Sequence, residues 1–240
     1  GNGHHYRWHV PHDVAGLLEL FGGRDAFLQD LDELLRKAET HGFVAPHTKH
    51  HDGYIDYSNQ PCTYLAHLFN YAGAPWLTQK WVRRVMKAAK SDITPFGGYG
   101  GDEDQGQMGA LNVLMAIGLF SVNGGCLGEP ILELSSPIFD RITIHLDKDY
   151  HDGDAFVIET MGNGNGDRYI QSAQLNGRPL NAAWIHHRDF VKGGSLRLTL
   201  GNEPNMNWAN HVIDIGADRN NAGRTTASTA TNESACGGTI

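Results

Sequence analysis

The sequence predicts an α+β protein in which a helical region precedes a small antiparallel β module. Across residues 14–120, apolar residues recur three to four positions apart, which is the spacing of an amphipathic helix. After Asn123-Gly124-Gly125 the period falls to two, which is typical of half-buried strands. We therefore expect a helical unit over residues 1–122 and an antiparallel β unit over residues 123–215.

Helices are expected wherever an apolar stripe is bounded by glycine or proline. The clearest stripe is formed by Phe27, Leu28, Leu31, Leu34 and Leu35, with charged residues between them. Gly22-Gly23, Gly73 and Pro75, and the glycines of residues 97–101 mark the breaks. The expected helices cover residues 14–22, 24–40, 61–72, 76–91 and 105–119.

The β unit shows alternation and turn signals in order. Ile142, Ile144 and Leu146 alternate with polar neighbours, and glycine-containing turns separate this strand from those that follow. Further strands are expected near residues 156–158, 169–175 and 196–200. Residues 216–240 are rich in Thr, Ser, Asn, Ala and Gly, which predicts a disordered or non-native tail.

Charge and cysteine usage exclude several functional classes. The 240 residues carry 19 Lys and Arg against 27 Asp and Glu, a net charge of −8, without a cationic cluster to track phosphates. We expect neither a nucleic-acid partner nor a membrane span, because no apolar stretch approaches the roughly 18 residues that a span requires. Cys62, Cys126 and Cys236 are too widely spaced for a disulfide framework or a zinc knuckle.

The segment Gly101-Asp102-Glu103-Asp104-Gln105-Gly106 places three acids in a glycine-rich turn before an apolar helix. One hypothesis is that Asp102 or Asp104 caps the helix, which would stabilise it by about 1 kcal/mol. The other is chemical, because closely spaced carboxylates can act as a general base or bind a hard cation. Either chemical role needs the glycines, because they let the backbone and the acids approach a ligand closely.

Two further segments combine aromatic and polar side chains. Residues 1–13 resemble a sugar site in composition, although His4, His5, His9 and His12 leave a metal site open as an alternative. Asp13 is also a candidate helix cap. In residues 47–61, the amide oxygens of Asn59 and Gln60 suit calcium, whereas Asn59 followed by Pro61 also suits a helix start.

Several motifs occur in a fixed order along residues 1–208. They are Tyr6-x-Trp8-x-Val10-Pro11-His12-Asp13, Asn59-Gln60-Pro61, Leu68-Phe69-Asn70-Tyr71-Ala72-Gly73-x-Pro75-Trp76, Gly101-Asp102-Glu103-Asp104-x-Gly106-Gln107-Met108, Ser136-Pro137-Ile138-Phe139-Asp140, Tyr169-Ile170-Gln171-Ser172-Ala173-x-Leu175-Asn176-Gly177 and Pro204-Asn205-Met206-Asn207-Trp208. Together they resemble the calcium-dependent α-mannosidases of glycoside hydrolase family 92, and the tail does not take part in the resemblance.

The resemblance implies an exo-acting, inverting α-mannosidase with an N-terminal β-sandwich and an (α/α)6 barrel of twelve helices. Five helices are too few for that barrel, so we expect a C-terminal fragment with exposed apolar helix faces, whose partners are a mannose-containing glycan and the missing N-terminal part. By resemblance, Asp104 is the catalytic base, assisted by Asp102. Asn59 and Gln60 are expected to contact Ca2+, and Asn2, Trp8, His12, Asp13 and Glu103 to contact the sugar.

The sequence also departs from the family pattern. The family's general acid is a Glu immediately before the pair that matches Gly1-Asn2, so we expect the isolated chain to be inactive. His4 stands where Trp is common and Gln60 where Glu is common. Tyr57 and Ser58 replace the His and acid that recognise an α-1,2-linked leaving mannose.

These departures keep alternative functions open. One is a non-catalytic glycan-binding remnant of such an enzyme. Another is a metal-dependent hydrolase of a different ester, which the lack of nearby Lys or Arg disfavours. The family implies a secreted or periplasmic location.

Overall fold

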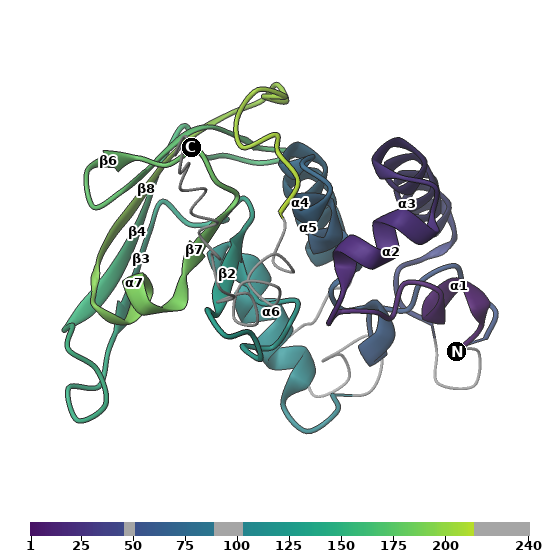
Figure 1. The fold of residues 1–240 in the computed structure, drawn as a ribbon, viewed down its shortest axis with the longest axis horizontal. Coiled ribbons are helices and arrows are strands. Elements are labelled where there is room, and N and C mark those ends of the chain that lie inside the picture. Colours follow the sequence, from purple (N-terminus) through teal and green to yellow (C-terminus); the bar gives the residue numbers. More distant parts are fainter. Residues whose placement is uncertain (46–50, 89–102, 214–240) are drawn as a thin grey trace, which may run out of the picture.

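The computed structural model describes residues 1–45, 51–88 and 103–213, and it confirms the α+β class. Helices α1–α3 lie at one end of the molecule and the larger sheet, with α7, at the other (Figure 1). The helices are α1 (Gly3–Tyr6), α2 (Val14–Leu20), α3 (Arg24–His41), α4 (Leu68–Tyr71), α5 (Pro75–Ala88), α6 (Gln107–Ile117) and α7 (His187–Val191). The wider (α/α)6 barrel stays a prediction.

Helix α3 follows its sequence pattern closely. Phe27, Leu31, Leu35 and Ala38 are completely buried, so the apolar stripe faces the core as its spacing predicts. The helix ends at Gly42, whose φ of 120° is open only to glycine. Helices of this length with a one-sided stripe are the most predictable elements, because local and tertiary preferences agree.

The continuous helix expected over residues 61–72 is wrong. The chain instead forms 3₁₀ turns at Gln60–Cys62 and Leu65–His67 before the short α4. The backbone N–H of Ala66 donates to the hydroxyl oxygen of Tyr57 at 3.0 Å, and so it takes no part in α-helical backbone hydrogen bonding. Every residue of this segment from 61 to 75 is buried, so tertiary contacts rather than local periodicity set its shape.

Two further elements differ from expectation. Residues 3–6 form α1, although the first expected helix begins at residue 14. Helix α6 ends at Gly118, with φ of 77°, and Leu119–Phe120 leave it as strand β1, so the sheet begins before the expected boundary at residue 122. Helix α5 is described as far as Ala88, and the rest of the expected helix over residues 76–91 lies outside the described residues.

The β unit contains two sheets. The smaller has the order β1-β2-β7, with β2 at Ile131–Leu134 and β7 at Trp184–His186. The larger has the order β3-β4-β8-β5-β6. Its strands are β3 (Arg141–His145), β4 (Ala155–Met161), β8 (Gly194–Gly201), β5 (Tyr169–Leu175) and β6 (Arg178–Pro179).

The expectation of a purely antiparallel module is wrong for one strand pair. Strands β4 and β8 are parallel, with Phe156 opposite Gly194 and Met161 opposite Thr199. The chain leaves β4, forms β5, β6, β7 and α7, and then returns to insert β8 between β4 and β5. Such a return depends on pairing between distant segments, which short-range alternation does not report.

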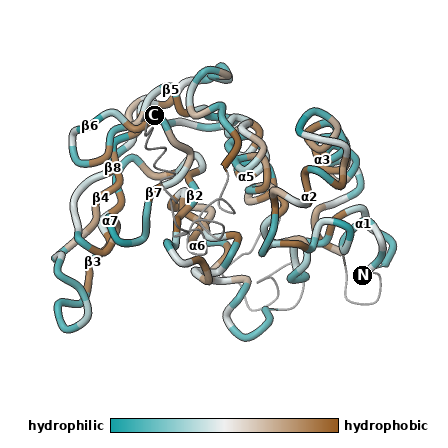
Figure 2. The backbone as a smooth tube through the Cα atoms, viewed as in Figure 1, coloured by the Kyte–Doolittle hydropathy of each residue, from teal (hydrophilic) through white to brown (hydrophobic). Residues whose placement is uncertain are grey.

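Two apolar cores result from this arrangement. One lies among the helices and includes Trp8, Phe27 and Trp81, whereas the other is built on Phe156 and Leu198 of the larger sheet. Figure 2 shows the hydrophobic residues along β4 and β8. Some apolar side chains stay exposed, as expected: Leu20 of α2 is 84% exposed and Val113 of α6 is 59% exposed.

Candidate active site

The acidic loop enters α6 through an unusual backbone conformation. Asp104, Gln105 and Gly106 have φ values of 54°, 60° and 95°, so three consecutive residues lie in the left-handed region. Residues other than glycine seldom adopt this conformation, and clusters of such strain occur at functional sites. Asp102, the expected assistant to the base, lies outside the described residues.

Glu103 caps α6, whereas the sequence predicted capping by Asp102 or Asp104. The carboxylate of Glu103 accepts hydrogen bonds from the backbone N–H groups of Gly106 and, at 3.2 Å, Gly109. A carboxylate near these N–H groups also complements the helix dipole. Both carboxylate oxygens of Glu103 thus accept hydrogen bonds from the protein backbone, and the sugar contact expected for this residue stays a prediction.

Asp104 contacts the second predicted site segment directly. The side-chain nitrogen Nε2 of Gln60 donates a hydrogen bond of 2.8 Å to Oδ2 of Asp104. Asp104 is half-buried and Gln60 is exposed, so the pair lies at the protein surface. The expected base and an expected calcium contact, 44 residues apart in sequence, therefore meet.

The residues at this contact and next to it in sequence carry oxygen atoms of the kind that a hard cation prefers. Asp104 has a carboxylate and Gln60 an amide oxygen, and Asn59, the residue before Gln60, has a second amide oxygen. The Asn59 side chain makes no capping hydrogen bond, although Pro61 lies in the first turn of the 3₁₀ segment that Gln60 begins. Within residues 1–45, 51–88 and 103–213, no three His, Cys, Asp or Glu side chains cluster in a way that could hold a metal ion.

Asn2 ties the first segment to the loop at residues 51–53. Its Oδ1 accepts a hydrogen bond from His4 N at 2.8 Å, and its Nδ2 donates to the carbonyl oxygens of His51 and Gly53 at 2.8 Å each. These residues border a shallow cleft of about 640 Å³, lined also by Gly3, Arg7, Asp52 and Tyr54. The ring of His4 lies 5.5 Å from that of Tyr54, so this cleft offers aromatic and polar groups together.

Trp8 and Asp13 have structural roles in this arrangement. Trp8 is completely buried, with its ring stacked on Phe21 at 4.4 Å and Arg7 over it at 5.1 Å, so it presents no face to a sugar. Asp13 caps α2, because Oδ1 accepts a hydrogen bond of 2.9 Å from Gly16 N. This confirms the capping alternative. His12 is exposed beside it.

Tyr57 and Ser58 also lie inside the protein. The Tyr57 ring is completely buried, and burial raises the pKa of its hydroxyl. Ser58 Oγ donates a hydrogen bond of 2.6 Å to Oδ1 of the buried Asp56. These two positions, expected to bear on recognition of the leaving sugar, therefore contribute to packing and buried hydrogen bonding.

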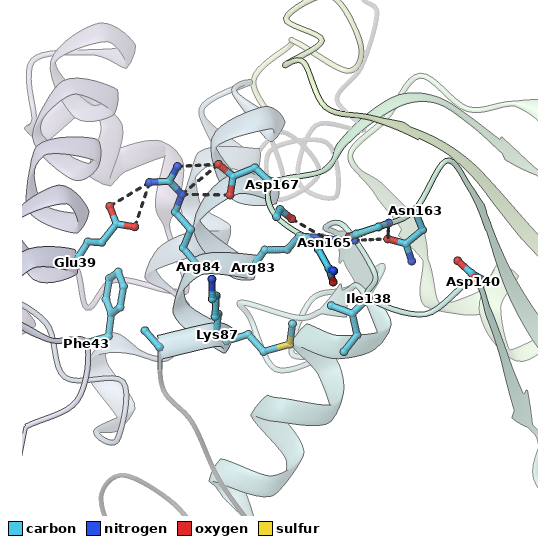
Figure 3. Close-up of a pocket in the computed structure, with 14 residues that line it drawn as sticks. Glu39, Phe43, Arg83, Arg84, Lys87, Ile138, Asp140, Asn163, Asn165 and Asp167 are labelled. Carbon is cyan, nitrogen blue, oxygen red and sulfur yellow. Dashed lines mark hydrogen bonds and ion pairs between the residues drawn. The ribbon is translucent and has the colours of Figure 1, made fainter.

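A second cleft, which the sequence reasoning missed, lies between the helical and β units. It has a volume of about 1080 Å³ and is bordered by α3, α5 and residues 163–167. Figure 3 shows Arg84 between Glu39 and Asp167, with Nη2 2.7 Å from the Asp167 carboxylate. The only sequence signal for it was the cationic pair Arg83-Arg84 next to the apolar stripe of α5.

Arg83, which also lines this cleft, links the helical unit to the β unit. Its buried guanidinium donates to Ser136 Oγ at 2.9 Å, to Asn163 Oδ1 at 2.7 Å and to the Gly164 carbonyl at 2.9 Å, and it also contacts the Pro137 carbonyl. Burial lowers the pKa of Arg83 to about 10, which leaves the group charged at neutral pH. The α5 helix is thereby fixed to the β unit.

Two of the three cysteines lie in the described part of the chain. Cys62 is buried, Cys126 is exposed, and both are free thiols, whereas Cys236 lies outside the described residues. Among the helices of the described ranges, none has the length and apolar character needed to cross a membrane.

Comparisons with known proteins identify relatives of one kind. The family model of the glycosyl hydrolase family 92 catalytic domain matches residues 1–202. An uncharacterized secreted glycosidase of Arthroderma benhamiae is 32% identical over 212 residues, which are 86% of this chain and 24% of the relative.

Two solved structures share the fold. A family GH92 α-mannosidase from Bacteroides thetaiotaomicron, in complex with mannoimidazole, has a TM-score of 0.73 at 26% identity and covers 88% of this chain. A family GH92 inverting mannosidase from the same species has a TM-score of 0.70 at 31% identity and covers 87% of this chain. The chain spans only 27% and 28% of the length of these two proteins.

Proposed function

The chain belongs to glycosyl hydrolase family 92, and from this membership we propose that it supplies the catalytic base of a glycosidase that removes terminal α-linked mannose from glycans. The observation that carries the proposal is the contact between Asp104 and Gln60, which unites two site segments at the protein surface. The mannosidase names of two structural relatives support the choice of sugar.

In the proposed mechanism, Asp104 takes a proton from water as the water attacks the anomeric carbon. An inverting glycosidase needs this base on one face of the sugar and an acid on the other, which protonates the leaving oxygen. Gln60 donates a hydrogen bond to Oδ2 of Asp104, and in this proposal Oδ1 takes the proton. Asp102 assists, and the general acid comes from outside this chain.

Calcium is part of the proposal. Asn59 and Gln60 would hold the ion, and its charge would orient the sugar hydroxyls and favour ring distortion. The cleft bordered by Asn2, His4 and Tyr54 includes part of residues 1–13, the segment that we assign to sugar binding. The secreted relative of A. benhamiae supports secretion of this protein as well.

The test uses the full-length protein that contains this chain, incubated with an α-linked mannobiose and followed by proton NMR. We expect β-mannose as the first product and loss of hydrolysis in EDTA. Asp104→Asn should lower kcat by about 100-fold or more, which is the usual contribution of a general base. Full activity of the Asp104→Asn protein would contradict the assignment of the base, and absence of hydrolysis by folded wild type would favour the glycan-binding alternative.

A further inference from the structure

The strained backbone of the acidic loop includes Asp104, the proposed base. Asp104 is the first of the three left-handed residues, and the two that follow carry the chain into α6. Each non-glycine residue in this region is held there only if its surroundings determine the conformation. Some contact must therefore compensate for the conformation of Asp104 and Gln105.

Glu103 provides that contact. Its carboxylate spans the left-handed turn and accepts hydrogen bonds from Gly106 N, at the end of the turn, and Gly109 N, in the first turn of α6. The backbone reinforces the same closure, because Met108 N donates to the Glu103 carbonyl at 3.1 Å. Glu103 thus fixes both ends of the segment that contains Asp104.

The other end of this linkage is rigid. Helix α6 is anchored in the helical core by Met108, Leu111 and Met115, which are at most 5% exposed. Glu103 therefore links the backbone next to Asp104 to a fixed helix, while Gln60 binds the Asp104 carboxylate. The backbone and the side chain of Asp104 are constrained separately.

We propose that Glu103 is a positioning residue, which holds Asp104 in the conformation needed for base catalysis and does not contact the sugar. This inference rests on the proposed function of Asp104. It replaces the sugar contact expected for Glu103 from the sequence, because both carboxylate oxygens are committed to backbone N–H groups. Loss of that carboxylate should disturb the reaction step more than the affinity for substrate.

The test compares two Glu103 variants with a matched control in the full-length protein, assayed on an aryl α-mannoside. Glu103→Ala removes both hydrogen bonds and should lower kcat by about 10- to 100-fold with KM within about twofold of wild type. Glu103→Gln keeps one carbonyl acceptor and should recover part of the lost kcat. The control is Asp147→Ala, since the exposed Asp147 carboxylate also accepts a backbone hydrogen bond, from Asp149 N at 2.9 Å, but in the β unit.

Thermal unfolding separates positioning from general stability. If Glu103→Ala and Asp147→Ala lower the melting temperature by similar amounts and only Glu103→Ala lowers kcat, the positioning role is supported. A rise in KM with unchanged kcat would instead identify Glu103 as a sugar contact and overturn the inference. Asp104→Asn in parallel keeps the two proposals apart: if that variant is inactive while Glu103→Ala keeps full kcat, the base assignment stands and the positioning role fails.

Discussion

Gln60 donates a hydrogen bond of 2.8 Å from its amide nitrogen to the Asp104 carboxylate. The donor lies at the start of a 3₁₀ turn and the acceptor in the left-handed turn before α6, so two irregular segments meet through one pair of side chains. Hydrogen bonds to charged groups are stronger than neutral ones and fix orientation. Gln60 therefore has two possible contributions to activity, through Asp104 and through calcium.

Gln60→Ala should separate these contributions in the full-length enzyme. We expect kcat at saturating calcium to fall about tenfold, because the Asp104 carboxylate loses the donor that orients it. The measurement is initial rate on an aryl α-mannoside at increasing calcium concentration. Gln29→Ala is the control, since Gln29 is an exposed glutamine on α3. An unchanged kcat at saturating calcium, with a higher half-saturating concentration, would show that Gln60 acts only through the metal.

The parts of the fold that local sequence could predict are those where local and tertiary forces agree. The helix expected over residues 24–40 is observed at Arg24–His41, because its stripe and its terminal glycine both favour that length. The segment from residue 61 to 72 was mispredicted because it is buried on all sides, and Tyr57 takes the N–H of Ala66. The parallel pairing of β4 and β8 depends on a long return that no local pattern records.

The candidate site shows the same division. The sequence indicated Asp104 and Gln60 separately, but not that their side chains would touch. It offered Asp102 or Asp104 as the cap of α6, whereas Glu103 makes the capping contacts, since that choice depends on the left-handed turn. Trp8 was expected at a sugar because exposed and buried aromatic residues look alike in sequence.

Arg83→Lys should destabilise the protein more than Arg84→Lys. Arg83 is buried and its guanidinium fork serves acceptors on several segments, including Ser136 and Asn163, which a lysine ammonium cannot reproduce. We expect the free energy of unfolding to fall by about 2–4 kcal/mol, because buried carbonyls lose their donors. Arg84→Lys should cost about 0–1 kcal/mol, since the Arg84 side chain is 35% exposed and salt screens its ion pairs.

Urea unfolding of the two arginine variants provides the measurement. Added salt should reduce the effect of Arg84→Lys and leave that of Arg83→Lys nearly unchanged. Equal losses for the two variants would contradict the role of Arg83 in joining the helical and β units.

Glu133 should make stability fall as pH rises. Its carboxyl group is completely buried and accepts hydrogen bonds from the Tyr71 hydroxyl and from Val122 N at 3.1 Å. Burial raises its pKa from 4.5 to about 7. Between these values the folded protein keeps a proton that the unfolded chain has lost, so the group's contribution to the free energy of unfolding decreases by about 1.4 kcal/mol per pH unit.

The contribution of Glu133 is isolated by comparison with Glu133→Gln, which cannot ionise. The stability of wild type relative to this variant should fall by about 3 kcal/mol between pH 4.5 and 7 and then level off. Urea unfolding at a series of pH values measures the difference. A difference that is independent of pH would show that Glu133 titrates in the folded protein as it does in the unfolded chain.

His67 should produce the opposite slope at lower pH. Its ring is completely buried and stacked on Phe120 at 4.1 Å, and neither ring nitrogen has a hydrogen-bond partner among the described residues. Burial lowers its pKa from 6.5 to about 3. Between these values the unfolded chain binds a proton that the folded protein excludes, so the contribution of His67 to stability is lost as pH falls.

The opposite contributions of Glu133 and His67 to the pH dependence of stability should therefore nearly cancel between pH 4.5 and 6.5. Variants of one residue at a time should reveal the slope that the other contributes. Glu133→Gln should lose stability on acidification by about 1.4 kcal/mol per pH unit in this window, because only His67 remains. His67→Gln should gain stability at a similar rate, because only Glu133 remains. A pH-independent free-energy cost of either substitution leaves these slopes unchanged. A wild-type slope that survives unchanged in both variants would assign the pH dependence to other groups.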